Sequence, residues 1–227
     1  MSQRTDSTYA AELNELRSRL LTLGGFVEKA IARSVQALAD RDTQLAEQVI
    51  TDDRRVNMME VEIDELCIRL LALRQPKASD LRFVTLALKV VTDLERIGDL
   101  AVNIAHRAID LNTREVLRPY VDIPRMAGIA EQMLRTVLDA FVASDADKAR
   151  SVLEKDDEVD ELYHSLFQEV IEMMTSEPET ITRATSVLFV AKHLERIADH
   201  TTNVAEMVIF LVEGRDVRHP GSRRDRY

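Results

Sequence analysis

The chain has 227 residues, of which only 6 are glycine and 5 are proline, while 4% are aromatic and none is tryptophan. This shortage of turn-forming and aromatic residues excludes a β-sandwich or a β-barrel and favours long helices. The net charge of −10 argues against charge-driven binding of nucleic acid or anionic lipid, and no apolar run reaches the ~18 residues that a membrane span requires.

The first half of the chain predicts three helices separated by short breaks. Apolar residues recur at steps of three and four from 13 to about 39, from about 43 to 73, and in a third segment that begins near Leu81. A polar break at 40–42 and a turn at 74–76 separate these segments. The single cysteine, Cys67, lies on the apolar stripe of the second helix, which predicts a buried thiol and no disulfide within the chain.

The second half predicts three more helices, at about 125–143, 146–175 and 179–212. Pro119 and Pro124 lie in the longest predicted linker, between the third and fourth helices. We therefore divide the chain into a first repeat at 8–113, a linker at 114–124, a second repeat at 125–214, and a tail at 215–227 with five arginines and two aspartates. The N-terminus has no apolar segment typical of a signal peptide, so we expect the protein to stay in the cytoplasm.

The two halves are copies of each other. The motif LERI at 94–97 returns at 194–197, followed in each half by matching aspartate, asparagine and alanine residues. Six earlier positions match at a constant spacing of 103 residues: Gly25, Glu28, Asp42, Val49, Asp53 and Val56 with Gly128, Glu131, Asp145, Val152, Asp156 and Val159. A duplication of this length predicts two packed bundles or a repeat stack. Gly25 and Gly128, inside helical patterns, predict a close helix approach or a kink.

The duplicated segment places acids where a core is expected. Glu95 and Asp99 are four residues apart and lie on one helical face, and Glu195 and Asp199 repeat this spacing. At ~100° per residue, four apolar residues lie within about 40° of Glu95: Val84, Leu88, Val91 and Val102. Carboxylates on such a stripe are costly unless they are paired or bind a metal.

The second helix of each half supplies further oxygen atoms at the same height. These side chains form the pairs Asp53 with Asn57 and Asp156 with Asp160. In an antiparallel hairpin, residues equally distant from the turn lie at one level, because both helices rise equally per residue. The midpoint of Asp53 and Asp99 falls at residue 76, and the midpoint of Asp156 and Asp199 falls between residues 177 and 178. Each half is therefore predicted to bring four oxygen-bearing side chains together.

Clustered carboxylates favour a bound cation, and ligation by oxygen alone favours magnesium, manganese, calcium or iron over a structural zinc ion, although zinc stays possible. Asn103 and Asn203 add amide oxygens one helical turn further on. The alternative is a pair of solvated acidic ridges, or ion pairs with Arg96 and Arg196.

The sequence lacks the motifs of several other functions. It has no glycine-rich phosphate loop, no nucleophile paired with a base and no basic patch for DNA, which leaves contact with protein partners. A carboxylate-bridged metal enzyme stays open as an alternative, although only one Glu-x-x-His motif, at Glu161 and His164, is present. A phosphorelay module is a further alternative, because the acid Glu195 follows closely after His193.

Four motifs resemble the PhoU family of phosphate-signalling regulators. They are LRQP at 73–76, DLRF at 80–83, DLERIGD at 93–99 and LERIAD at 194–199, and the resemblance runs from about Leu13 to Val212. It implies an all-α fold of two tandem, pseudo-symmetric three-helix bundles packed side by side. It also implies metal clusters held by the acidic motifs that contain Asp53, Glu95, Asp156 and Glu195. Asn57 departs from the pattern, since the second half has Asp160 there, and the first site loses one charge.

The resemblance also implies a role. Members restrain the phosphate-starvation response when phosphate is plentiful, acting between the ATPase of the phosphate ABC transporter and a membrane histidine kinase. We therefore expect a non-enzymatic, metal-binding regulator that forms a homodimer, contacts those two proteins, binds no nucleic acid and does not insert into a membrane.

Overall fold

The computed structural model describes residues 2–74, 76, 78–117 and 122–214. The Arg-rich tail, Pro119 and Gln75 of the predicted turn lie outside these residues. The elements, in chain order, are α1 (Ser2–Ala39), α2 (Thr43–Arg74), α3 (Ala78–Asn112), α4 (Asp122–Ala143), α5 (Ala146–Ser176), a 3₁₀ turn η1 (Pro178–Thr180) and α6 (Ile181–Glu213). The prediction of an all-α protein with six long helices is confirmed.

Two predicted boundaries differ from the structure. The helix α1 begins near the N-terminus rather than at Leu13, and α4 begins at Asp122 rather than at about 125. Pro124 therefore lies in the first turn of α4 instead of in the linker. A proline is tolerated there because the first N–H groups of a helix have no acceptor within it.

The duplication extends to the backbone of the turns. Arg41 and Ser144, which are equivalent in the two halves, both adopt the left-handed conformation, with φ values of 56° and 53°. The next residue caps the following helix in each half: an Asp42 Oδ1 accepts from the N–H of Leu45, and an Asp145 Oδ1 accepts from the N–H of Lys148, both at 2.9 Å. The left-handed residue reverses the chain, and the aspartate satisfies an N–H that the helix leaves unpaired.

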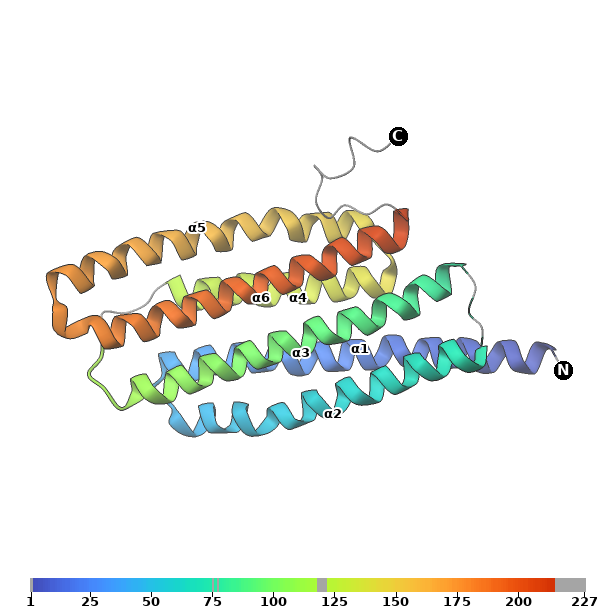
Figure 1. Cartoon of the computed structure of the whole chain (residues 1–227), viewed down its shortest axis with the longest axis horizontal. Helices are drawn as coiled ribbons and strands as arrows, with labels where there is room; N and C mark the ends of the chain where they lie inside the picture. Colours follow the sequence, from blue (N-terminus) through green and yellow to red (C-terminus); the bar gives the residue numbers. More distant parts are fainter. Residues whose placement is uncertain (1, 75, 77, 118–121, 215–227) are drawn as a thin grey trace.

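The helices form two three-helix bundles that lie side by side (Figure 1). Across the junction α1 contacts α4 and α3 contacts α6. Within the described residues, α2 packs on α1 and α3 alone, and α5 packs on α4, α6 and the turn η1. The rings of Phe83 and Phe141 stack across the junction with centroids 5.0 Å apart. Because α2 and α5 are the outer helices, each keeps one long face in solvent.

Glycine permits the closest approach of the two halves. A Cβ atom on Gly24 would lie 2.0 Å from Cδ1 of Leu138, so a side chain on α1 at this position would force the Leu138 side chain of α4 to move. The expectation of close contact at Gly25 and Gly128 is wrong, because a Cβ atom on either residue would meet nothing within 4 Å. Equivalent glycines marked the repeat in the sequence, but the neighbouring Gly24 carries the contact.

A polar contact also joins the two bundles. The Nδ1 atom of His200 on α6 lies 2.8 Å from Oδ1 of Asp93 on α3, and both side chains are mostly buried. Neither residue is repeated in the other half, since His193 stands where the duplication would place a second Asp93. The contact therefore fixes how the two copies face each other.

We expect the Asp93 and His200 side chains to couple by about 1 kcal/mol in unfolding free energy, the usual net value of a partly buried hydrogen bond. A double-mutant cycle of Asp93→Ala, His200→Ala and both together, measured by urea unfolding, gives this coupling directly. Strictly additive effects of the two substitutions would contradict the proposed role of the contact.

Candidate metal centre

The first acidic cluster lies where α2 and α3 cross closely. The Oδ2 atom of Asp53 accepts a hydrogen bond of 3.0 Å from Nδ2 of Asn57, one turn further along α2. The Oδ1 atom of Asp53 would lie 3.4 Å from a Cβ atom on Gly98 of α3. The missing side chain of Gly98 thus brings the Asp53 carboxylate against α3, beside Glu95 and Asp99. The structure thus brings α2 and α3 together at the level of Asp53 and Asp99, as the sequence predicts.

The electrostatics of this cluster show that its members interact. Burial raises the pKa of Glu95, and the charge of Asp99 raises it further. Burial also raises the pKa of Asp53, again with a contribution from Asp99. Arg96 offsets part of this repulsion, since its guanidinium lies 3.4 Å from Glu95 and 3.5 Å from Asp99. The ion pairs with Arg96, which the sequence left open as the alternative to a bound metal, are therefore present in the first cluster.

Glu60 belongs to the same cluster, although the sequence analysis did not identify it. Its pKa is raised first by burial, then by the neighbouring Asp64, and also by Asp99 across the helix pair. Glu60 lies seven residues after Asp53, which places both on one face of α2. This spacing could have identified Glu60 from the sequence. The duplication did not point to it, because the equivalent position in the second half carries Tyr163.

The largest pKa shift among the carboxylates of the two clusters is found in the second cluster, between α5 and α6. The pKa of Asp156 is raised to about 6 by burial and then by the charges of Asp160 and Asp199. Burial raises the pKa of Asp160 too, and the charge of Glu195 adds to this effect. Three aspartates and one glutamate thus repel one another between α5 and α6, as the sequence predicted for this level.

The two carboxylate oxygen atoms of Glu195 differ in their hydrogen bonding. Its Oε1 accepts a 2.6 Å hydrogen bond from Nζ of Lys192, whereas its buried Oε2 has no hydrogen-bond partner. The predicted counter-ion Arg196 is exposed, and Lys192 takes the place that Arg96 takes in the first cluster. A buried carboxylate oxygen without a donor is costly, so this atom is suited to accept a cation.

Other predicted ligands lie further out. Asn57, Asn103 and Asn203 are exposed. Over residues 2–74, 76, 78–117 and 122–214, no three His, Cys, Asp or Glu side chains lie close enough together for a common metal ion. Binding would therefore require rotation of side chains that now pair with Arg96 or Lys192. The donors nevertheless fit a hard cation, because both clusters offer oxygen atoms alone and one of those atoms is orphaned.

The remaining candidate side chains are one cysteine and three histidines. Cys67 is buried, as predicted, and burial raises the pKa of its thiol to about 12. His193 is partly buried and stacks on the ring of Phe189. Burial and the nearby charges of Arg107 and Arg196 lower its pKa to about 4. His106 and His164 are exposed.

The fold and the clusters define a helical protein of two pseudo-symmetric bundles, each with an acidic centre between its second and third helices. The family model "PhoU domain" matches this chain twice, over residues 20–108 and 123–208. The chain belongs to the PhoU family. No helix in the part of the chain that the structure describes is long and apolar enough to cross a membrane.

Similar proteins agree over nearly the whole length. The chain is 45% identical to the "Phosphate-specific transport system accessory protein PhoU homolog" of Pseudomonas putida, over 99% of this chain and 88% of that protein. It is 37% identical to the PhoU accessory protein of Escherichia coli, over 97% of this chain and 92% of that one. The crystal structure of PhoU from Pseudomonas aeruginosa superposes with a TM-score of 0.87 at 45% identity, covering 91% of this chain and all of that one.

Proposed function

We propose that this protein is a non-enzymatic, metal-binding regulator of phosphate uptake that restrains the phosphate-starvation response. The names of its relatives support the coarse role, since they are accessory proteins of phosphate-specific transport systems. A relative of known structure, from Streptococcus pneumoniae, is described as a phosphate transport system regulatory protein. The finer proposal adds metal at the two acidic clusters and cytoplasmic contacts with an ABC transporter ATPase and a histidine kinase.

The observation that carries the regulatory proposal is an apolar stripe on the outer face of α2. Met58, Val61 and Ile68 are 61%, 56% and 60% exposed, although each is a large apolar side chain. Their spacing of three and seven residues aligns them along one edge of the helix. An exposed apolar stripe on a helix typically marks a protein interface.

The second half offers an internal comparison for this stripe. The equivalent positions on α5 carry Glu161, His164 and Ile171, so only one of the three is apolar. The duplicated fold therefore does not require the stripe, and its presence in one copy favours a role in binding. Along α2, Met58 and Val61 flank Glu60 of the first acidic cluster.

We expect substitution of Met58, Val61 and Ile68 by serine to weaken binding of the purified transporter ATPase about tenfold or more, because apolar side chains at an interface each contribute about 1 kcal/mol or more. The matched control is Phe167→Ser with Ile171→Ser, which removes the exposed apolar residues of α5. Equal affinity of the stripe variant and the wild type for both the ATPase and the histidine kinase would contradict this assignment. Sedimentation of the free protein in the same series tests the proposed homodimer.

The two alternative functions, a carboxylate-bridged metal enzyme and a phosphorelay module, are less well supported. The relatives are named for accessory and regulatory roles rather than for catalysis. A phosphorelay at His193 would need an accessible ring, whereas this side chain is partly buried and packed on Phe189.

A further inference from the structure

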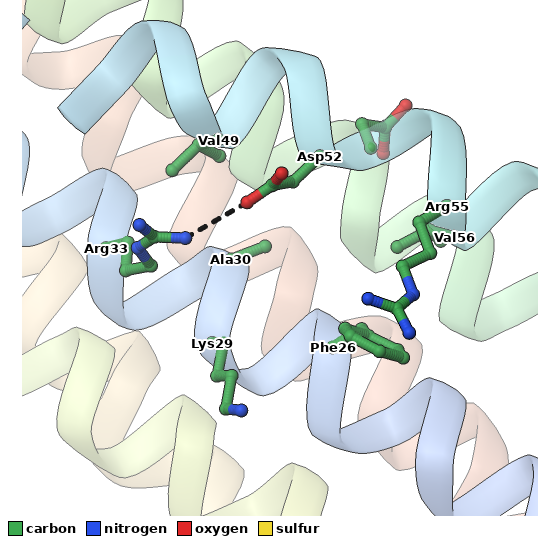
Figure 2. A pocket seen from close by; sticks show the side chains of 9 residues that line it. Phe26, Lys29, Ala30, Arg33, Val49, Asp52, Arg55 and Val56 are labelled. Carbon is green, nitrogen blue, oxygen red and sulfur yellow. Dashed lines mark hydrogen bonds and ion pairs between the residues drawn. The ribbon is translucent and has the colours of Figure 1, made fainter. Parts of the chain in front are cut away.

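A pocket of about 200 Å³ lies between α1 and α2. Figure 2 shows the side chains that line it. Three of these side chains are cationic: Lys29 and Arg33 come from α1, and Arg55 comes from α2. The only acids in the lining are Asp52 and Asp53.

Each arginine is held by neighbouring groups at the pocket wall. Arg33 donates to Asp52 at 3.0 Å and to Gln48 at 2.8 Å, which fixes its guanidinium beside the opening (Figure 2). Arg55 stacks on the ring of Phe26, with its guanidinium carbon 4.2 Å from the ring centroid. A stacked guanidinium keeps its edge N–H donors available, and these donors match a phosphate group.

The remaining charges leave the pocket with unneutralised cations. Lys29 and Arg55 have no ion pair among the residues that the structure describes. Asp52 neutralises only Arg33. The carboxylate of Asp53 is directed toward α3, because one oxygen lies against Gly98 and the other accepts from Asn57. Lys29 and Arg55 are therefore the cations left for a ligand. Figure 2 shows the Lys29 side chain extended away from α2, so its flexible stem must rotate to bring the amino group to an anion beside Arg55.

The duplicated half shows that the fold does not require these cations. The apolar residues behind the pocket, Val49 and Val56, are repeated as Val152 and Val159. Asp53 is repeated too, as Asp156, but the cationic and aromatic lining residues are not: Phe26, Lys29, Arg33 and Arg55 correspond to Ile129, Gln132, Thr136 and Glu158. Two neutral residues and an acid thus replace the three cations, so the cations of the first half serve something other than packing.

We propose that this pocket binds a phosphate group, with Arg55 and Lys29 as its principal donors and Arg33 at its edge. Its volume is below the roughly 300–1,000 Å³ of sites for larger organic ligands, which favours a small oxyanion over a nucleotide. This proposal deepens the proposed regulatory function, on which its biological meaning rests, by giving the regulator a site for the anion whose uptake it controls.

The test is calorimetric titration of the chelator-treated protein at low ionic strength with three separate probes: inorganic phosphate, glycerol 3-phosphate and sulfate. We expect phosphate to bind, and Lys29→Gln with Arg55→Gln to lower its affinity about tenfold or more, because hydrogen bonds to charged groups contribute about 1.5–3 kcal/mol each. The matched control is Arg54→Gln with Arg69→Gln, which removes two exposed charges from α2. Thermal unfolding checks that both double variants are folded.

Each outcome is decisive. Tighter binding of glycerol 3-phosphate than of inorganic phosphate supports a site for a phosphomonoester, a ligand that carries the same phosphate group on an organic molecule. Absence of binding by the wild type, equal binding of sulfate, or unchanged affinity in the Lys29 and Arg55 variant would overturn the proposal. The titration contains no metal and no partner protein, so absence of phosphate binding does not contradict the regulatory proposal. Loss of ATPase binding by the α2 stripe variant likewise does not contradict the phosphate-binding proposal.

Discussion

Replacing Glu95 and Glu195 together by alanine is expected to reduce metal binding by the purified protein to background. Each glutamate lies in one acidic cluster: burial and the charge of Asp99 raise the pKa of Glu95, and the buried Oε2 atom of Glu195 has no hydrogen-bond partner among the described residues. Equilibrium dialysis against Mn²⁺, followed by elemental analysis, measures the loss. Mn²⁺ is a suitable probe because the clusters offer oxygen donors alone.

A charge-matched variant separates ligation from general electrostatics. Glu65→Ala with Glu169→Ala also removes two glutamates, but both are exposed and lie outside the clusters. We expect this control to bind as much Mn²⁺ as the wild type. The single variants compare the halves: the first cluster, where Asn57 replaces an acid, should bind more weakly than the second. Equal and negligible metal in the wild type and in the double variant would refute the metal proposal.

The Asp156→Asn variant is expected to be more stable than the wild type at pH 8 in the presence of a chelator. The pKa of Asp156 is about 6 in the native protein against an ordinary value of 3.8. Between these values the native state binds more protons than the unfolded state, so the free energy of unfolding falls as the pH rises from about 4 to 6. Above pH 6 the full penalty persists, at about 1–3 kcal/mol after allowance for solvent screening.

Urea unfolding at pH 4, 6 and 8 tests this expectation. The gain of Asp156→Asn should be full at pH 8 and absent at about pH 4, where the carboxyl is protonated in both states. Added Mn²⁺ should reverse the order at pH 8, because the wild type then gains the stabilisation of a bound ligand. The control is Glu154→Gln, which removes an exposed charge from the same helix that does not contribute to the raised pKa of Asp156. An effect of Asp156→Asn that is the same at every pH would contradict the proposed strain.

The hairpin geometry was predictable because helices rise uniformly along the chain. The sequence positions of Asp53 and Asp99 about the turn at residue 76 were sufficient to place them at one level, and the same reasoning placed Asp156 beside Asp199. The repeat itself was readable from LERI at 94–97 and 194–197. These inferences needed only local periodicity and one turn per hairpin.

Features that depend on contacts between distant elements were not predictable in this way. The pairing of His200 with Asp93 joins two helices whose relative rotation the sequence does not specify. The repeat singles out Gly25, which is equivalent to Gly128, although of the two neighbouring glycines it is Gly24 that faces another helix. Lys192 replaces the expected Arg196 because side-chain reach and rotation, rather than sequence position, decide which cation meets Glu195.

The regulatory role itself is open to a single test in cells. The gene would be expressed in a bacterium that lacks its own PhoU-family gene, with a reporter of the phosphate-starvation response measured in phosphate-rich medium. We predict that the wild-type chain represses the reporter and that the variant with serine at Met58, Val61 and Ile68 does not, although it accumulates to the same level. A reporter that stays fully active with the wild-type chain, as it does with the empty vector, would contradict the regulatory role.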